Sequence, residues 1–81
     1  MKVFLYALST CFYCRQTKKF MEDNGIEFEH VDVDLAEQSE KEKLMKEVID
    51  LTGAGKFPVI KIGEQVVVGY DEDKLKDLLI S

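Results

Sequence analysis

The first apolar stretch of the chain, Lys2 to Leu8 (KVFLYAL), limits the fold more than any other feature of the sequence. Apolar and polar residues do not alternate in it, so a strand formed here must be buried on both faces. Helices packed on the two sides of a sheet provide that cover. The 81 residues are enough for one hydrophobic core, and we expect a single domain over residues 1–81.

Helical spacing of apolar residues, β-branched runs and turn-forming residues give the order of the remaining elements. The expected elements are a strand over 2–8, a helix over 12–24, a strand over 26–33, a helix over 38–51, a hairpin of strands 58–62 and 65–68, and a last helix beginning at 71–73. A β-α-β unit crosses over right-handedly and pairs its strands in parallel, and the hairpin adds antiparallel strands. The β-α-β-α-β-β-α order therefore predicts an α/β fold with a four-stranded mixed sheet and three helices.

Two local patterns refine the expected helices. Ser39 followed by Glu42 resembles a capping box near the start of the second helix. The last helix should bury one apolar face, formed by Leu75, Leu78, Leu79 and Ile80.

Charge and cysteine content exclude several classes of function. The net charge of −5 repels phosphate backbones, so we expect no nucleic-acid partner. No apolar run approaches the ~20 residues of a membrane span, and the first residues do not resemble a signal peptide, so no membrane partner is expected. Two cysteines cannot supply the disulfide framework of a small secreted domain, which favours a cytoplasmic location.

The segment that carries chemistry is Cys11-Phe12-Tyr13-Cys14, at the junction of the first strand and the first helix. The first turn of a helix has unpaired N–H groups and carries about half a unit of positive charge, which stabilises a thiolate. The i, i+3 spacing brings the second sulfur to the same face, where it can attack a mixed disulfide formed at the first. We expect Cys11 to be the attacking nucleophile and Cys14 to be the resolving thiol with the higher pKa.

Other interpretations of the two cysteines stay open at this stage. They could be ordinary buried residues, or the chain could be a redox-inactive adaptor. A structural zinc ion needs four ligands, and His30 is the single histidine, so we expect no metal site within one chain. Two chains could still share an iron–sulfur cluster through Cys11.

The sequence resembles the glutaredoxins of the thioredoxin-like superfamily over essentially its whole length. The resemblance rests on the element order and three segments, which are Cys11-Phe12-Tyr13-Cys14, Lys56-Phe57-Pro58 (Thr-Val-Pro in the family) and Val68-Gly69-Tyr70-Asp71-Glu72 (a Gly-Gly pair and an acid in the family). It implies a thioredoxin-like fold and a thiol–disulfide oxidoreductase. It also implies no bound cofactor, with glutathione as one candidate reductant.

The resemblance further implies which residues surround the cysteines. The Phe57-Pro58 bond should be cis and face them, so that a substrate docks as an added strand. Tyr13 should form a wall of the groove, Arg15 and Lys56 could hold a carboxylate, and Asp71 or Glu72 an ammonium group. The expected substrate-binding residues are Phe12, Tyr13, Arg15, Lys56, Phe57, Pro58, Gly69, Tyr70, Asp71 and Glu72.

The chain also departs from the family pattern near the expected glutathione site. Phe12 replaces a proline, Leu8 replaces a basic residue, Lys56 replaces a threonine, and Val68 replaces the first glycine of the pair. These changes bring it closer to the thioredoxin-reductase-dependent glutaredoxin-like proteins that serve ribonucleotide reductase, or to small glutaredoxin-like proteins whose electron donor is unknown. We expect a monomer that acts on disulfide-containing proteins, with glutathione or a thioredoxin reductase as electron donor.

Overall fold

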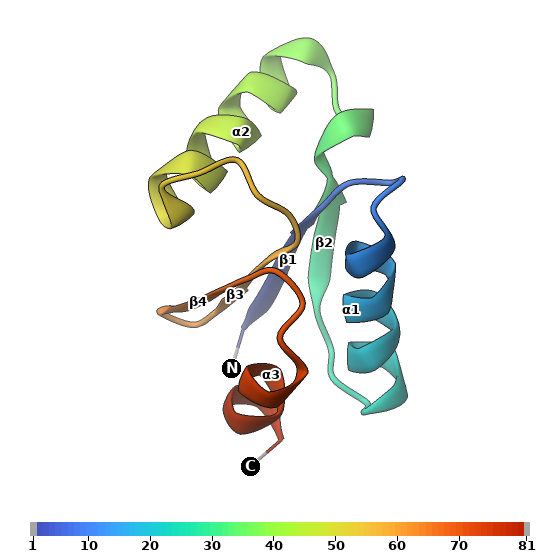
Figure 1. Cartoon of the computed structure of the whole chain (residues 1–81). Helices are drawn as coiled ribbons and strands as arrows, with labels where there is room; N and C mark the ends of the chain where they lie inside the picture. Colours follow the sequence, from blue (N-terminus) through green and yellow to red (C-terminus); the bar gives the residue numbers. More distant parts are fainter. Residues whose placement is uncertain (1, 81) are drawn as a thin grey trace.

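The computed structural model describes residues 2–80, and the expected order of elements is present in them (Figure 1). The elements are β1 (Val3–Ala7), α1 (Phe12–Asp23), β2 (Glu29–Asp32), a 3-10 turn η1 (Val33–Leu35), α2 (Gln38–Thr52), β3 (Val59–Ile62), β4 (Gln65–Val68) and α3 (Glu72–Leu79). The strands form one mixed sheet in the order β2-β1-β3-β4. The predicted fold class is therefore confirmed.

The register of the sheet places β1 in its interior. Leu5 lies opposite His30 of the parallel strand β2 and opposite Ile60 of the antiparallel strand β3. The β3–β4 hairpin pairs Ile60 with Val67. Because β1 and β2 run in parallel, their carboxyl ends meet at one edge of the sheet, where α1 begins.

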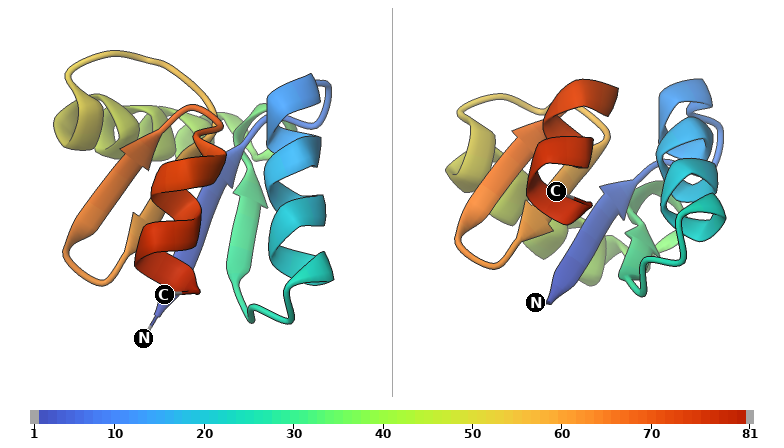
Figure 2. Two further views of the ribbon diagram at one scale, coloured as in Figure 1. Left: turned by 60° about the horizontal axis from the view of Figure 1, so that its bottom comes forward. Right: turned by 90° about the horizontal axis from the view of Figure 1, so that it is seen from below.

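Helices cover both faces of this sheet, with α1 and α3 on one side and α2 on the other (Figure 2). Side chains of β1 alternate between the two layers. Val3, Leu5 and Ala7 pack with residues of α1 and α3, whereas Tyr6 packs with Leu44 and Val48 of α2. Both faces of β1 are thus apolar because each meets a helix layer, which explains the absence of a polar face in the sequence.

Three local expectations are wrong. The second strand spans only Glu29–Asp32 and not 26–33, since Val33 already belongs to η1. No capping box forms at α2, because the helix begins at Gln38 and Ser39 lies inside it; its N-cap, Glu37, makes no side-chain capping bond. Ile80 is 49% exposed because it lies about 140° around the helix axis from the buried Leu75.

The helices of the described residues are too short or too polar to span a membrane. Within residues 2–80, none combines the length and the apolar character needed to cross a bilayer.

Candidate active site

Cys11 is the N-cap of α1, and its sulfur takes the place of a capping oxygen. Its backbone is extended, with φ −81° and ψ 123°, and its N–H donates to the carbonyl oxygen of Leu8 at 3.2 Å. The Cys11 Sγ accepts a hydrogen bond from the backbone N–H of Cys14 at 3.3 Å. A helical N–H aimed at a sulfur stabilises its anionic form more than its neutral form. The local geometry therefore places the Cys11 sulfur against a backbone donor at the start of α1.

Cys14 lies one turn further along α1 and is fully buried. Burial, followed by the hydrogen bond with the Cys11 side chain, raises the pKa of Cys14 to about 12. A hydrogen bond with the Leu8 backbone and the positive charge of Lys18 oppose this rise. Cys14 therefore stays a neutral thiol near neutral pH, while Cys11 is the sulfur that solvent and a partner can reach.

The two residues between the cysteines form an aromatic pair on the surface. Phe12 is 63% exposed and Tyr13 is 59% exposed. Their rings meet edge to face, with centroids 5.5 Å apart and an interplanar angle of 82°. The pair presents a large apolar area beside Cys11.

The Phe57-Pro58 peptide bond is cis, as predicted. Pro58 is buried, and its carbonyl oxygen accepts a hydrogen bond from the N–H of Gly69 at 2.7 Å. Gly69 has φ +81°, a conformation that favours glycine. Phe57 packs against the same buried cluster as Cys11. The structure thus brings Cys11, Cys14, Phe57, Pro58 and Gly69 into one region.

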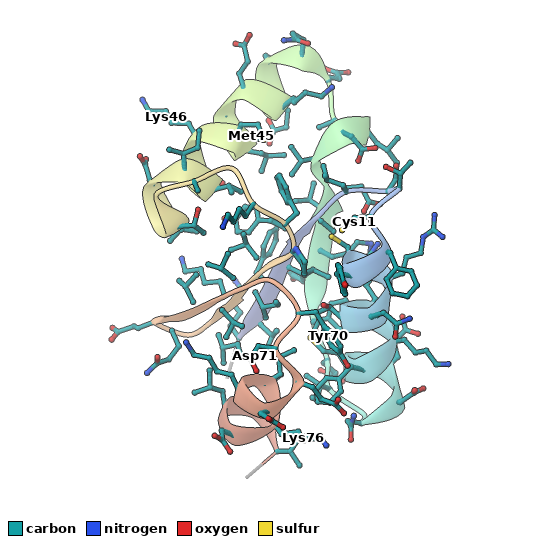
Figure 3. All side chains as sticks on the ribbon, in the orientation of Figure 1. Cys11, Met45, Lys46, Tyr70, Asp71 and Lys76 are labelled. Atoms are coloured by element: carbon teal, nitrogen blue, oxygen red, sulfur yellow. The ribbon has the colours of Figure 1, made fainter. Side chains whose placement is uncertain are left out.

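Other expected site residues have local structural contacts instead. Asp71 caps α3 by accepting the Lys74 N–H at 3.1 Å, and Glu72 pairs with Lys76 at 3.3 Å. The Tyr70 ring packs edge-on to Phe20 of α1, with centroids 6.4 Å apart. Figure 3 shows Cys11 at one end of α1, with Asp71 and Lys76 away from it at α3.

The two basic residues expected in the site, Arg15 and Lys56, lie in different surroundings. The Arg15 guanidinium donates from Nη2 to the Ser9 carbonyl oxygen at 3.5 Å, so it lies over the turn that leads into Cys11. Lys56 is exposed in the loop before Phe57.

Two polar contacts near the cysteines were missed by sequence reasoning. Asp34 accepts hydrogen bonds from Ser9, and Lys18 pairs with Asp32 at 3.2 Å. A usable signal existed, because Asp32 ends the second strand and Asp34 comes just after it, and the carboxyl ends of adjacent parallel strands lie side by side.

The described residues around Cys11 form no group of side chains suited to a metal ion. Within residues 2–80, no three His, Cys, Asp or Glu side chains are grouped so that they could hold a metal ion. Two surface hollows of about 390 and 380 Å³ lie elsewhere, one between α1 and α3 and one over Phe4 and Tyr6. The Cys11 sulfur belongs to a half-buried residue outside both hollows.

A capping thiol with a second, buried thiol one turn below it, on this strand order, defines the thioredoxin-like class of thiol–disulfide oxidoreductases. The chain belongs to the glutaredoxin family, whose family profile matches residues 3–67. This result confirms the resemblance seen in the sequence.

Individual relatives support the same assignment. The crystal structure of a glutaredoxin from Archaeoglobus fulgidus is 36% identical, with a TM-score of 0.93 and coverage of 99% of this chain and 87% of that one. The glutaredoxin-like protein NrdH of Salmonella typhimurium is 30% identical over 96% of this chain and 89% of its own length. NrdH-redoxin from Escherichia coli, described as having a thioredoxin-like activity profile, is 26% identical with a TM-score of 0.78, over 100% of this chain and 99% of that one.

Proposed function

We propose that the protein reduces disulfides in other proteins through Cys11 and Cys14, and that a thioredoxin reductase returns the electrons. The Cys11 thiolate attacks one sulfur of the substrate disulfide, whose S–S bond breaks and releases the other sulfur as a thiol. The first substrate sulfur takes its proton from solvent. Cys14 then attacks the Cys11 sulfur of the mixed disulfide, whose S–S bond breaks, and the second substrate sulfur leaves with the proton that Cys14 gives up. The substrate leaves with two electrons and two protons more, and the protein is left with a Cys11–Cys14 disulfide.

The observation that carries the proposal is the 3.3 Å hydrogen bond from the Cys14 N–H to the Cys11 sulfur, combined with the complete burial of Cys14. These two features give the two thiols different roles, with Cys11 as the attacking group and Cys14 as the resolving group. When Cys11 is bonded to a substrate sulfur, its sulfur carries no negative charge. It also no longer accepts a hydrogen bond from the Cys14 thiol. Both contributions of Cys11 to the high pKa of Cys14 then disappear, which favours the second attack.

The surface beside Cys11 suits a protein disulfide as substrate. The exposed aromatic pair Phe12 and Tyr13 supplies apolar contact area of the kind found at protein interfaces. The cis-proline segment leaves backbone groups beside the same region, where an extended peptide can add as a strand.

The choice of electron donor rests on the residues near the cis-proline. Val68 lies opposite Val59 at the end of the hairpin, and its side chain is 42% exposed where the family has a glycine. Such a side chain narrows the groove expected for glutathione, and Leu8 supplies no positive charge for its carboxylates. The thioredoxin-like activity profile described for the E. coli relative points the same way. In this proposal the protein acts as a cytoplasmic monomer, with a ribonucleotide reductase as candidate target.

Two coupled assays test the donor. Reduction of insulin disulfides is followed through NADPH oxidation, once with thioredoxin reductase and once with glutathione and glutathione reductase. We expect turnover with thioredoxin reductase and much slower turnover with glutathione. The opposite preference would contradict the proposal.

A single substitution sharpens this comparison. Val68→Gly should raise the rate with glutathione because it restores the open groove, and it should leave the rate with thioredoxin reductase near that of the wild type. Gln65→Gly is the matched control, since it loosens the exposed start of the same strand β4 and should not raise the glutathione rate.

A further inference from the structure

The turn that leads into Cys11 is held by a single carboxylate from another part of the chain. The Cys11 N–H bonds to the Leu8 carbonyl oxygen at 3.2 Å, which closes a β-turn over residues 8–11. Within this turn the Ser9 N–H donates to Asp34 Oδ1 at 2.8 Å, and the Ser9 hydroxyl donates to Asp34 Oδ2. The Arg15 guanidinium donates to the Ser9 carbonyl oxygen at 3.5 Å. Every polar group of Ser9 is therefore held.

The sheet explains how Asp34 reaches this turn. Ala7, the last residue of β1, is paired with Asp32, the last residue of the parallel strand β2. The chain continues from β2 into η1, so Asp34 lies beside the residues that follow β1. The two hydrogen bonds from Ser9 lower the pKa of Asp34, which keeps its carboxylate ionised and both oxygens available as acceptors near neutral pH.

We propose that Asp34 is a positioning residue for the redox reaction. Its two carboxylate oxygens accept hydrogen bonds from Ser9 and so fix the turn that places the Cys11 sulfur against the Cys14 N–H. The role follows from the order of contacts, from Asp34 to Ser9, through the turn to Cys11, and from Cys11 to the helix N-terminus. The role in catalysis rests on the proposed redox function. The contact between Asp34 and the turn can be tested without that function.

The charge of Asp34 acts in the opposite direction to its hydrogen bonds. A negative charge near Cys11 disfavours a thiolate, whereas a firmly held turn favours it by keeping the sulfur under a helical N–H. The substitution Asp34→Asn separates the two effects. Asparagine loses the charge but retains an oxygen that can accept the Ser9 N–H, and its amide can donate to the Ser9 hydroxyl oxygen.

The experiment compares Asp34→Ala and Asp34→Asn in a Cys14→Ser background, which leaves Cys11 as the sole thiol and retains the residue-14 N–H. The rate of Cys11 alkylation by iodoacetamide near neutral pH reports the thiolate. Hydrogen–deuterium exchange of the residue-14 amide reports its bond to Cys11. We expect Asp34→Ala to slow alkylation about tenfold and to speed exchange of that amide, because the sulfur is displaced. Asp34→Asn should stay close to the reference in both measurements.

Controls make the outcome specific to positioning. Asp50→Ala removes an exposed acid from α2 and should change neither measurement. If Asp34→Ala is poorly folded in urea unfolding, Ser9→Ala replaces it; this change removes only the hydroxyl contact and should give a smaller effect in the same direction.

Two outcomes would overturn the proposal. Alkylation that is unchanged or faster in Asp34→Ala would show that the carboxylate does not position Cys11. Equal slowing in Asp34→Asn and Asp34→Ala would show that hydrogen bonds from residue 34 do not hold the turn, because asparagine can still form them. Neither measurement needs a reductase or a substrate disulfide. If the protein proved not to reduce disulfides, the two measurements would still show whether Asp34 positions Cys11.

Discussion

Lys18 Nζ lies 3.2 Å from Asp32 Oδ1, and this ion pair joins α1 to the end of β2 one helical turn beyond Cys14. The side chains retain only 24% and 22% of their exposure, so water screens the pair less than it screens a surface ion pair. Because residues at i and i+4 share a helix face, Asp32 holds the ammonium group on the same side of α1 as the resolving thiol. Asp32 therefore keeps the positive charge of Lys18 in place near Cys14.

Lys18→Gln should slow the second step of the reaction. The positive charge of Lys18 lowers the pKa of Cys14, so its removal raises that pKa and reduces the fraction of Cys14 able to attack. We expect a longer-lived mixed disulfide, measured by acid quenching and mass spectrometry. Lys19→Gln, which removes the same charge from an exposed position on α1, should leave this lifetime unchanged. Equal effects of the two changes would assign the result to net charge.

Replacing each cysteine separately should give different products. Cys14→Ser should accumulate a mixed disulfide between Cys11 and a protein substrate, because no second thiol releases it. Cys11→Ser should form none, because Cys14 is fully buried. Non-reducing electrophoresis with a disulfide-containing substrate distinguishes the two. Mixed disulfides formed by Cys11→Ser would reverse the assigned roles.

The raised pKa of Cys14 predicts how stability depends on pH. Folding moves this pKa from its ordinary 9.0 to about 12, so above pH 9.0 the unfolded chain releases a proton that the folded chain retains. The stabilising effect is complete below pH 9.0 and is lost as pH rises toward 12. Urea unfolding of the reduced protein should show a steeper loss of stability across this window than Cys14→Ser shows. Parallel curves for the two proteins would contradict the shift.

Gly69→Ala should destabilise the protein by about 1 kcal/mol, because alanine is strained at positive φ. No atom lies within 4 Å of a Cβ added there, so the cost comes from the backbone and not from a clash. Gly55→Ala is the matched control: its φ is not positive, and an added Cβ would meet only the flexible end of Met45 at 3.4 Å. Urea midpoints measure both. A larger loss for Gly55→Ala would show that the contact with Met45 outweighs backbone strain.

The fold was predictable from the sequence because its signals are local. The apolar stretch at the start, the Asn24-Gly25 stop and the Gly63-Glu64 turn each act within a few residues, and the right-handed crossover rule then leaves few topologies. The position of Cys11 at a helix start was predictable for the same reason. The error at Ile80 arose from counting apolar residues without following their angle around the helix.

The contacts that support the cysteines were not predictable in the same way. Asp34 meets Ser9 and Asp32 meets Lys18 across distances of 25 and 14 residues along the chain. Whether such acids reach the turn depends on the register of β2 against β1, and a one-residue slip would turn each side chain to the opposite face. The short strand β2, with its exposed Glu29 and His30, carries little apolar pattern from which to fix that register.

The pairing of β1 with β3 also affects when a newly made chain becomes reactive. Val3 pairs with Ile62, and the Pro58–Gly69 hydrogen bond completes the region beside Cys11. A ribosome-bound chain that has not yet released these later residues already contains both thiols but lacks the surface that selects their partner. The region beside Cys11 is therefore complete only after β3 and Gly69 have been made and have folded against β1, more than 50 residues after the cysteines themselves.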